Sequence, residues 1–133
     1  MTDVTTIVDI NYQIKIINTG GHMVNISSDI IRGYNDIMIL YLLLKNPSYG
    51  YEISKNIKAM TNEKYIIKET TLYSAFTRLE GNGYVTSYQQ TADNGKKRTY
   101  YKITESGNEY YKNKCEEWDL IKQVVEVFIK KDN

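Results

Sequence analysis

Apolar and polar positions change their period along the chain, and each change marks a predicted element. Between Thr70 and Gly83, Leu72, Phe76 and Leu79 recur at a spacing that places them on one face of a helix. The opposite face is polar and offers hydrogen-bond donors: Thr70, Thr71, Tyr73, Ser74, Thr77 and Arg78. The pattern predicts a helix that is buried on one side and presents donors suited to a groove of nucleic acid on the other.

A hairpin is predicted immediately after this helix. Gly81 and Gly83 can end the helix, because glycine readily takes the left-handed conformation of a helix C-terminus. Two strand-like runs follow at 84–90 and 98–104. The turn between them contains Asp93-Asn94-Gly95, a sequence typical of hairpin turns, and then three basic residues, Lys96, Lys97 and Arg98. A polar-faced helix followed by a basic-tipped hairpin is the outline of a winged helix.

Two further helices are predicted before this unit. The first has its N-cap at Ser27-Ser28-Asp29 and ends before Asn46-Pro47, because the residue before proline avoids the α region. Its apolar stripe comprises Ile30, Tyr34, Ile37, Tyr41 and Leu44. The second spans 49–60, with a stripe of Ile53, Ile57 and Met60. Residues 61–68 are predicted to form a short strand or a turn.

The last predicted helix runs over 105–130, with Thr104 as its N-cap. Tyr111, Trp118 and Val125 are seven residues apart, as are Ile121 and Phe128, so the apolar seam follows a coiled-coil-like heptad. A seam of this length is hard to bury within so small a monomer. We therefore predict that these five residues form a homodimer interface.

The N-terminal segment has a different pattern. Apolar residues alternate with polar ones from Val8 to Ile16, which predicts one strand. The strand is followed by Gly20-Gly21-His22-Met23, a junction typical of expression vectors. Residues 1–22 are therefore interpreted as a vector-derived extension or a native strand, 23–104 as a winged-helix DNA-binding domain, and 105–133 as a dimerisation helix. The expected fold is mainly α with a small β-hairpin.

Composition limits the function classes. The chain has 133 residues, of which 41% are hydrophobic and 25% charged, as in a globular domain. The longest apolar run, 37–44, is far shorter than the roughly 20 residues that span a bilayer. A lone Cys115 and the absence of a signal-peptide pattern favour the cytoplasm. With one cysteine and one doubtful histidine, His22, we expect no enzyme activity, no metal site and no cofactor.

Charge is distributed unevenly along the chain. Residues 54–104 carry nine Lys or Arg against four acids, a net charge of +5, whereas 105–133 carry a net charge of −2. The positive potential therefore coincides with the polar-faced helix and the hairpin, where phosphates would need it.

Several short motifs, taken together, resemble the PadR family of transcriptional regulators over about residues 28–129. They are Gly50-Tyr51-Glu52-Ile53, Thr71-Leu72-Tyr73, Arg78-Leu79-Glu80 with Gly83, Arg98-Thr99-Tyr100-Tyr101 and Thr104-Glu105-Ser106-Gly107. The resemblance implies a homodimer on a palindromic operator in double-stranded DNA, with the third helix in the major groove. It also implies that Tyr73, Ser74 and Thr77 face base edges and phosphates, and that Lys97 and Arg98 lie on the wing.

The single C-terminal helix with a central tryptophan resembles the short, LmrR-like branch of that family, which includes multidrug-binding repressors. This implies that Trp118 and its symmetry mate bind a planar aromatic effector between the subunits. This chain departs from the branch with Cys115 one turn before the tryptophan and Lys122 one turn after it, while Asp119 points elsewhere on the helix. Neutral or anionic planar ligands are therefore as consistent with the sequence as cationic ones.

The sequence thus predicts a cytoplasmic, ligand-responsive repressor. Two alternatives stay open. One is a DNA-binding regulator without a small ligand, controlled by a partner protein or by oxidation of Cys115. The other is a winged helix used only as a protein-interaction module, against which the +5 segment argues.

Overall fold

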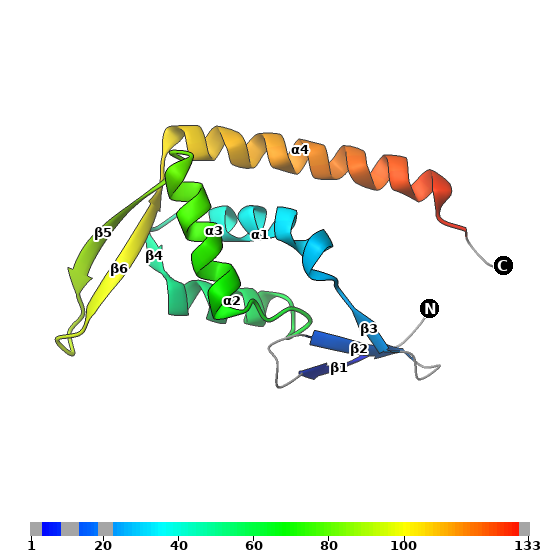
Figure 1. Ribbon diagram of the computed structural model, residues 1–133, viewed down its shortest axis with the longest axis horizontal. Coiled ribbons are helices and arrows are strands. Elements are labelled where there is room, and N and C mark those ends of the chain that lie inside the picture. The colour runs from blue at the N-terminus through cyan, green and yellow to red at the C-terminus, as the bar shows by residue number, and fades with distance from the viewer. Residues whose placement is uncertain (1–3, 9–13, 19–22, 131–133) are drawn as a thin grey trace.

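The computed structural model describes residues 4–8, 14–18 and 23–130. Four helices dominate it (Figure 1): α1 (Ser28–Leu43), α2 (Gly50–Met60), α3 (Glu69–Gly81) and α4 (Glu105–Phe128). The long helix α4 lies along α1, and a hairpin of β5 (Val85–Thr91) and β6 (Lys97–Ile103) projects from one end of the molecule. The mainly helical fold with a small sheet confirms the predicted fold class.

The core lies between the first three helices and the base of the hairpin. The predicted inner face of α3 is confirmed, since Leu72, Phe76 and Leu79 are all buried. Phe76 stacks on Tyr101 of β6 with ring centroids 3.9 Å apart, which fixes the hairpin against α3. The chain thereby turns the polar face of α3 outward.

The apolar stripe predicted for α1 is not the face that enters this core. Ile30 and Tyr41 are exposed, whereas the buried residues of α1 are Asn35, Asp36, Ile39, Leu40 and Leu43. The core-facing side of α1 contains two polar residues, Asn35 and Asp36, so its apolar periodicity is interrupted. The predicted position of Met60 in the stripe of α2 is also wrong, because its side chain is 58% exposed.

The single N-terminal strand predicted for 8–16 is replaced by two strands. β1 (Val4–Val8) pairs antiparallel with β2 (Ile14–Asn18), and β2 pairs with β3 (Met23–Asn25). Residues 9–13 lie between the paired ends Val8 and Ile14 and are outside the described residues. His22 is also outside them. The interpretation of residues 1–22 as a vector-derived extension or a native strand stays a prediction.

The hairpin belongs to a three-stranded antiparallel sheet of order β4-β6-β5. Its two long strands start and end within one residue of the predicted positions, and Gly83 and Gly95 take the positive φ that their turns require. Sequence analysis missed the two-residue strand β4 (Ser48–Tyr49), which pairs with the outer side of β6. Residues 61–68 form turns and irregular structure rather than a strand.

One junction joins the end of α3, the hairpin and the start of α4. The Thr104 hydroxyl accepts a hydrogen bond from the backbone N–H of Gly107, as predicted for an N-cap, and donates one to the Gly83 carbonyl at 2.7 Å. The Ser106 hydroxyl donates to the same carbonyl at 2.9 Å. Gly107 lies so close to the strand that an added Cβ would be 2.0 Å from the carbonyl oxygen of Tyr84. The three elements are therefore fixed to one another at a single point.

Candidate nucleic-acid interface

The outer face of α3 is polar and open to solvent. Of the predicted contact residues, Thr70, Tyr73, Ser74, Thr77 and Arg78 are exposed, and Thr71 is half-buried. Leu72, Ala75, Phe76 and Leu79 bury the opposite face. A helix anchored on one side and presenting hydroxyl groups on the other has the arrangement required to read base edges in a major groove.

Tyr73 is held at the edge of this face by the neighbouring helix. Its ring packs edge-on against Phe76 at 5.7 Å, and its hydroxyl lies beside Gly50 at the start of α2. A Cβ at position 50 would lie 2.7 Å from that hydroxyl oxygen. The glycine of the Gly-Tyr-Glu-Ile motif therefore leaves space for the tyrosine that we expect to contact DNA.

The basic tip of the hairpin lies at the far end of the two strands from α3 (Figure 1). Lys96 and Lys97 are exposed, and no described carboxylate forms an ion pair with either of them or with Arg98. The Arg98 guanidinium lies 4.4 Å from the ring centroid of Tyr49, a cation–π contact that points it across the outer face of the sheet. The lysines at the tip are free to approach phosphates.

Tyrosines continue this outer face away from the core, and sequence analysis did not select them. Tyr100 lies 5.2 Å from Tyr49 and 5.7 Å from Tyr88, measured between ring centroids. The alternation of strand side chains places Tyr100 on the same face as Arg98, and this signal was available in the sequence. The wing therefore combines positive charge with aromatic side chains.

Arg78 is tied to the interior of the protein as well as exposed on α3. Its Nη2 donates a hydrogen bond to Oδ1 of Asp36 in α1, and the two side chains form an ion pair. The Tyr110 hydroxyl of α4 donates to the other carboxylate oxygen at 3.2 Å. The Asp36 side chain, only 7% exposed, thus links α1, α3 and α4. Apolar periodicity gave no signal for this buried acid.

Trp118, the central residue of the predicted ligand site, lies where α4 passes α1. Trp118 contacts Tyr34 of α1 edge to face at 5.0 Å, and sequence analysis, which placed Tyr34 in the stripe of α1, did not predict this contact. The Lys122 ammonium lies 5.7 Å from the centroid of the Trp118 ring and 3.7 Å from Asp119. A cation of the protein itself therefore already lies over the indole.

Cys115 lies on the same side of α4 and is half-buried. Burial, followed by a hydrogen bond to Cys115, raises the pKa of Tyr111 to about 12. The Tyr111 ring also lies 6.5 Å from that of Tyr41. This part of α4 is consequently packed against α1 of its own chain.

The second half of α4 exposes apolar side chains both within the predicted heptad seam and outside it. Trp118, Val125 and Phe128 are 41%, 47% and 80% exposed, whereas Tyr111 and Ile121 are half-buried. The heptad missed a second group of exposed residues, namely Leu120, Val124, Val127 and Ile129. Exposed apolar patches of this extent mark association surfaces.

In the part of the chain that the structure describes, no helix combines the length and apolarity needed to cross a membrane. Within the same residues, no three His, Cys, Asp or Glu side chains are grouped so that they could hold a metal ion.

Three helices followed by a hairpin that pairs with a short strand define a winged helix-turn-helix protein. The family model described as Transcriptional regulator PadR-like family matches residues 39–113. The chain belongs to this family, whose members are DNA-binding regulators.

Three individual proteins illustrate the similarity, and two of them are solved structures of transcriptional regulators. A transcriptional regulator from Clostridium thermocellum is 61% identical, with a TM-score of 0.73, over 77% of this chain and 100% of its own. A PadR family transcription regulator from Clostridium difficile is 34% identical, with a TM-score of 0.62, over 73% of this chain and 99% of its own. An uncharacterized protein from Lysinibacillus sphaericus is 42% identical over 78% of this chain and 95% of its own.

Proposed function

We propose that this chain is a cytoplasmic, homodimeric repressor that binds a palindromic operator and responds to a planar aromatic effector. The observation that carries the proposal is the exposed polar face of α3 beside a wing whose lysines have no described ion-pair partner. Tyr73, Ser74 and Thr77 read base edges, and the wing lysines contact the backbone. Base contacts supply discrimination, whereas phosphate contacts supply salt-dependent affinity.

Fluorescence anisotropy with DNA from upstream of the gene tests the DNA-binding part. We expect Ser74→Ala to weaken binding to the operator by about 1–3 kcal/mol relative to a scrambled duplex. Ser54→Ala is the matched control, because Ser54 lies in α2 rather than on the exposed face of α3 and is half-buried. Absence of salt-sensitive binding to any upstream fragment would leave only a protein-interaction role.

The exposed apolar side chains of α4 support the homodimer. A second copy of the chain would cover Val125 and Phe128 together with the second apolar group. We expect Val125→Glu to shift sedimentation from dimer to monomer, because it places an unpaired charge among apolar groups. Gln123→Glu is the control, since Gln123 donates a hydrogen bond to Asp119 on the polar side of the helix. A dimer unaffected by Val125→Glu would refute this interface.

The indole of Trp118 and the edge-on ring of Tyr34 support the effector site. Lys122 over the indole favours anionic planar compounds, because it neutralises them and repels cations. We expect 2-naphthoate to quench the fluorescence of this sole tryptophan more strongly than ethidium does at equal concentration. Lys122→Ala should reverse that order while leaving the dimer intact.

The effector is expected to change the spacing of the two α3 helices and therefore the affinity for DNA. Linkage requires DNA to change the effector affinity by the same factor. Calorimetric titration of 2-naphthoate with and without operator measures that factor. DNA binding that no planar aromatic changes would instead favour a regulator without a small ligand.

A further inference from the structure

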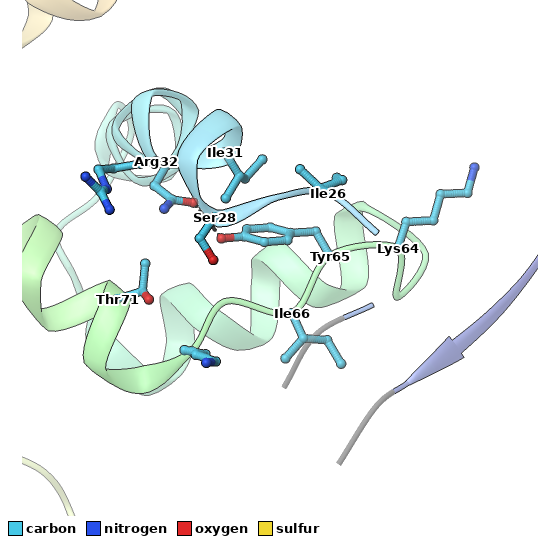
Figure 2. Close-up of a pocket in the computed structure, with 10 residues that line it drawn as sticks. Ile26, Ser28, Ile31, Arg32, Lys64, Tyr65, Ile66 and Thr71 are labelled. Atoms are coloured by element: carbon cyan, nitrogen blue, oxygen red, sulfur yellow. Dashed lines mark hydrogen bonds between the residues drawn. The ribbon is translucent and has the colours of Figure 1, made fainter. Parts of the chain in front are cut away.

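A cavity of about 110 Å³ lies where the N-terminal turns of α1 and α3 meet the connection between α2 and α3 (Figure 2). Its walls include the apolar side chains of Ile31 and Ile66, and none of its lining residues is acidic. Trp118 does not line it. The cavity is therefore distinct from the proposed effector site.

A buried amide, that of Asn35, lines the cavity. Asn35 is 1% exposed, and its Oδ1 accepts a hydrogen bond of 2.7 Å from the Tyr65 hydroxyl. Among the described residues, the side-chain hydrogen bond found for Asn35 uses Oδ1, and none is found for Nδ2. Every fully buried side-chain nitrogen or oxygen of those residues has a partner. Asn35 lines the cavity, and Tyr65 already uses its Oδ1, so Nδ2 is the part of the amide that we assign to an occupant of the cavity.

Hydroxyl groups and a helix terminus add further donors. Ser28 at the start of α1 and Thr71 in α3 line the opening, with Thr71 projecting from α3 toward α1 (Figure 2). α3 begins after Lys68 without a side-chain cap. The first N–H groups of α3 consequently have no intrahelical partner and lie at the positive end of the helix dipole.

Positive charge borders the same opening. Arg32 and Lys68 line it, whereas Lys64, which also lines it, points its ammonium group away (Figure 2). The acids Asp29 and Glu69 occupy the first turns of α1 and α3 but are not among the lining residues. The cavity thus presents donors and cations without a competing carboxylate on its wall.

We propose that this cavity binds an oxyanion, that is, a phosphate or carboxylate group, hydrogen-bonded by Asn35 Nδ2 and the two hydroxyls and paired with Arg32. Two sources have this chemistry: a phosphodiester of the DNA that α3 contacts, and a small organic anion free in solution. Since Thr71 and Lys68 belong to the start of α3, either occupant is linked to DNA binding. Only the first source rests on the proposed function.

The first test uses the full chain without DNA and inorganic phosphate as the probe. Amide NMR spectra are recorded during titration with phosphate at constant ionic strength, with chloride as the balancing anion. We expect saturable shifts of the Asn35 side-chain NH₂ and of the Thr71 amide, and at least tenfold weaker binding in the double variant Arg32→Gln/Lys68→Gln. Lys112→Gln on α4 should bind phosphate as the unmodified chain does. The proposal would be overturned if the chemical shifts did not saturate with phosphate, or if Lys112→Gln weakened phosphate binding as much as the double variant does.

The second test distinguishes the two sources by the salt dependence of operator binding. For a bound phosphodiester, the slope of log affinity against log salt falls by about 0.9 in the double variant. For a free anion, the slope is unchanged, and phosphate inhibits DNA binding by the unmodified chain more than by the variant. Saturable phosphate binding in a chain that binds no DNA would support the cavity as an anion site while refuting the proposed function.

Discussion

Arg78 is expected to act mainly as a structural link, and Arg78→Met tests this. The substitution keeps the length of the side chain and its fit in a helix but removes the donors to Asp36. Among the described residues, the Tyr110 hydroxyl is then the one side chain that still donates a hydrogen bond to the buried carboxylate. Breaking a fully buried ion pair typically costs 3–5 kcal/mol, and a hydrogen bond to a charged group contributes about 1.5–3 kcal/mol. Because the Arg78 side chain is 40% exposed, water screens the pair, and we expect Arg78→Met to lower the free energy of unfolding by about 2 kcal/mol, within the range for a hydrogen bond to a charged group.

Urea denaturation at fixed protomer concentration measures this loss. With a slope of about 1–3 kcal/mol per molar urea, the midpoint should fall by about 1 M. Asp36→Asn and the double variant complete a thermodynamic cycle, in which the double variant should lose less stability than the two single losses combined. An unchanged midpoint together with a DNA-binding salt slope reduced by about 0.9 would refute the link and make Arg78 a phosphate contact.

The remaining predictions concern packing, charge and pH. Gly107→Ala should lower the free energy of unfolding by about 3 kcal/mol, because the added Cβ would meet a backbone carbonyl that cannot move aside. Gly33→Ala, where no atom lies within 4 Å of the added Cβ, should raise it by up to about 1 kcal/mol. Thermal unfolding of both variants measures the difference. Lys97→Gln should lower the slope of log operator affinity against log salt by about 0.9, and Lys112→Gln should leave it unchanged; equal slopes would exclude a wing contact. Burial raises the pKa of Tyr65 from 10.0 to about 12. The neutral Tyr65 hydroxyl therefore contributes fully to stability below pH 10, and this contribution is lost as the pH rises through 12. Tyr65→Phe should flatten the alkaline decline in the free energy of unfolding.

The parts of the fold that the sequence predicted correctly are those in which one residue type dominates a face. Leu72, Phe76 and Leu79 repeat with the helical period and are buried, and the Asn-Gly turn located the hairpin to within one residue. The two-residue strand β4 could not be predicted in this way, because its position depends on pairing with β6 rather than on a local pattern.

Buried polar groups account for the errors at the candidate site. Asn35 and Asp36 interrupt the inner face of α1, so the search for apolar periodicity selected the stripe that begins at Ile30. Asp36 is buried because Arg78, 42 residues away, supplies its counter-charge. Long-range pairs of this kind leave no mark on local spacing. The contact between Tyr34 and Trp118 was missed for a similar reason, since it arises only when α4 packs on α1.

The junction at Gly83 fixes the first turn of α4, so that a movement at the far end of this helix corresponds to a rotation about the junction. Hydrogen bonds from Thr104 and Ser106 fix the end of α3, the wing and the first turn of α4 to one carbonyl group. The 24 residues of α4 extend about 36 Å from this pivot at 1.5 Å per residue. A displacement of about 2 Å at the free end then corresponds to a tilt of only about 3° at the pivot. A small molecule bound near the middle of α4 would need to displace the helix by little more than half that distance to reorient the surface that we propose to contact DNA.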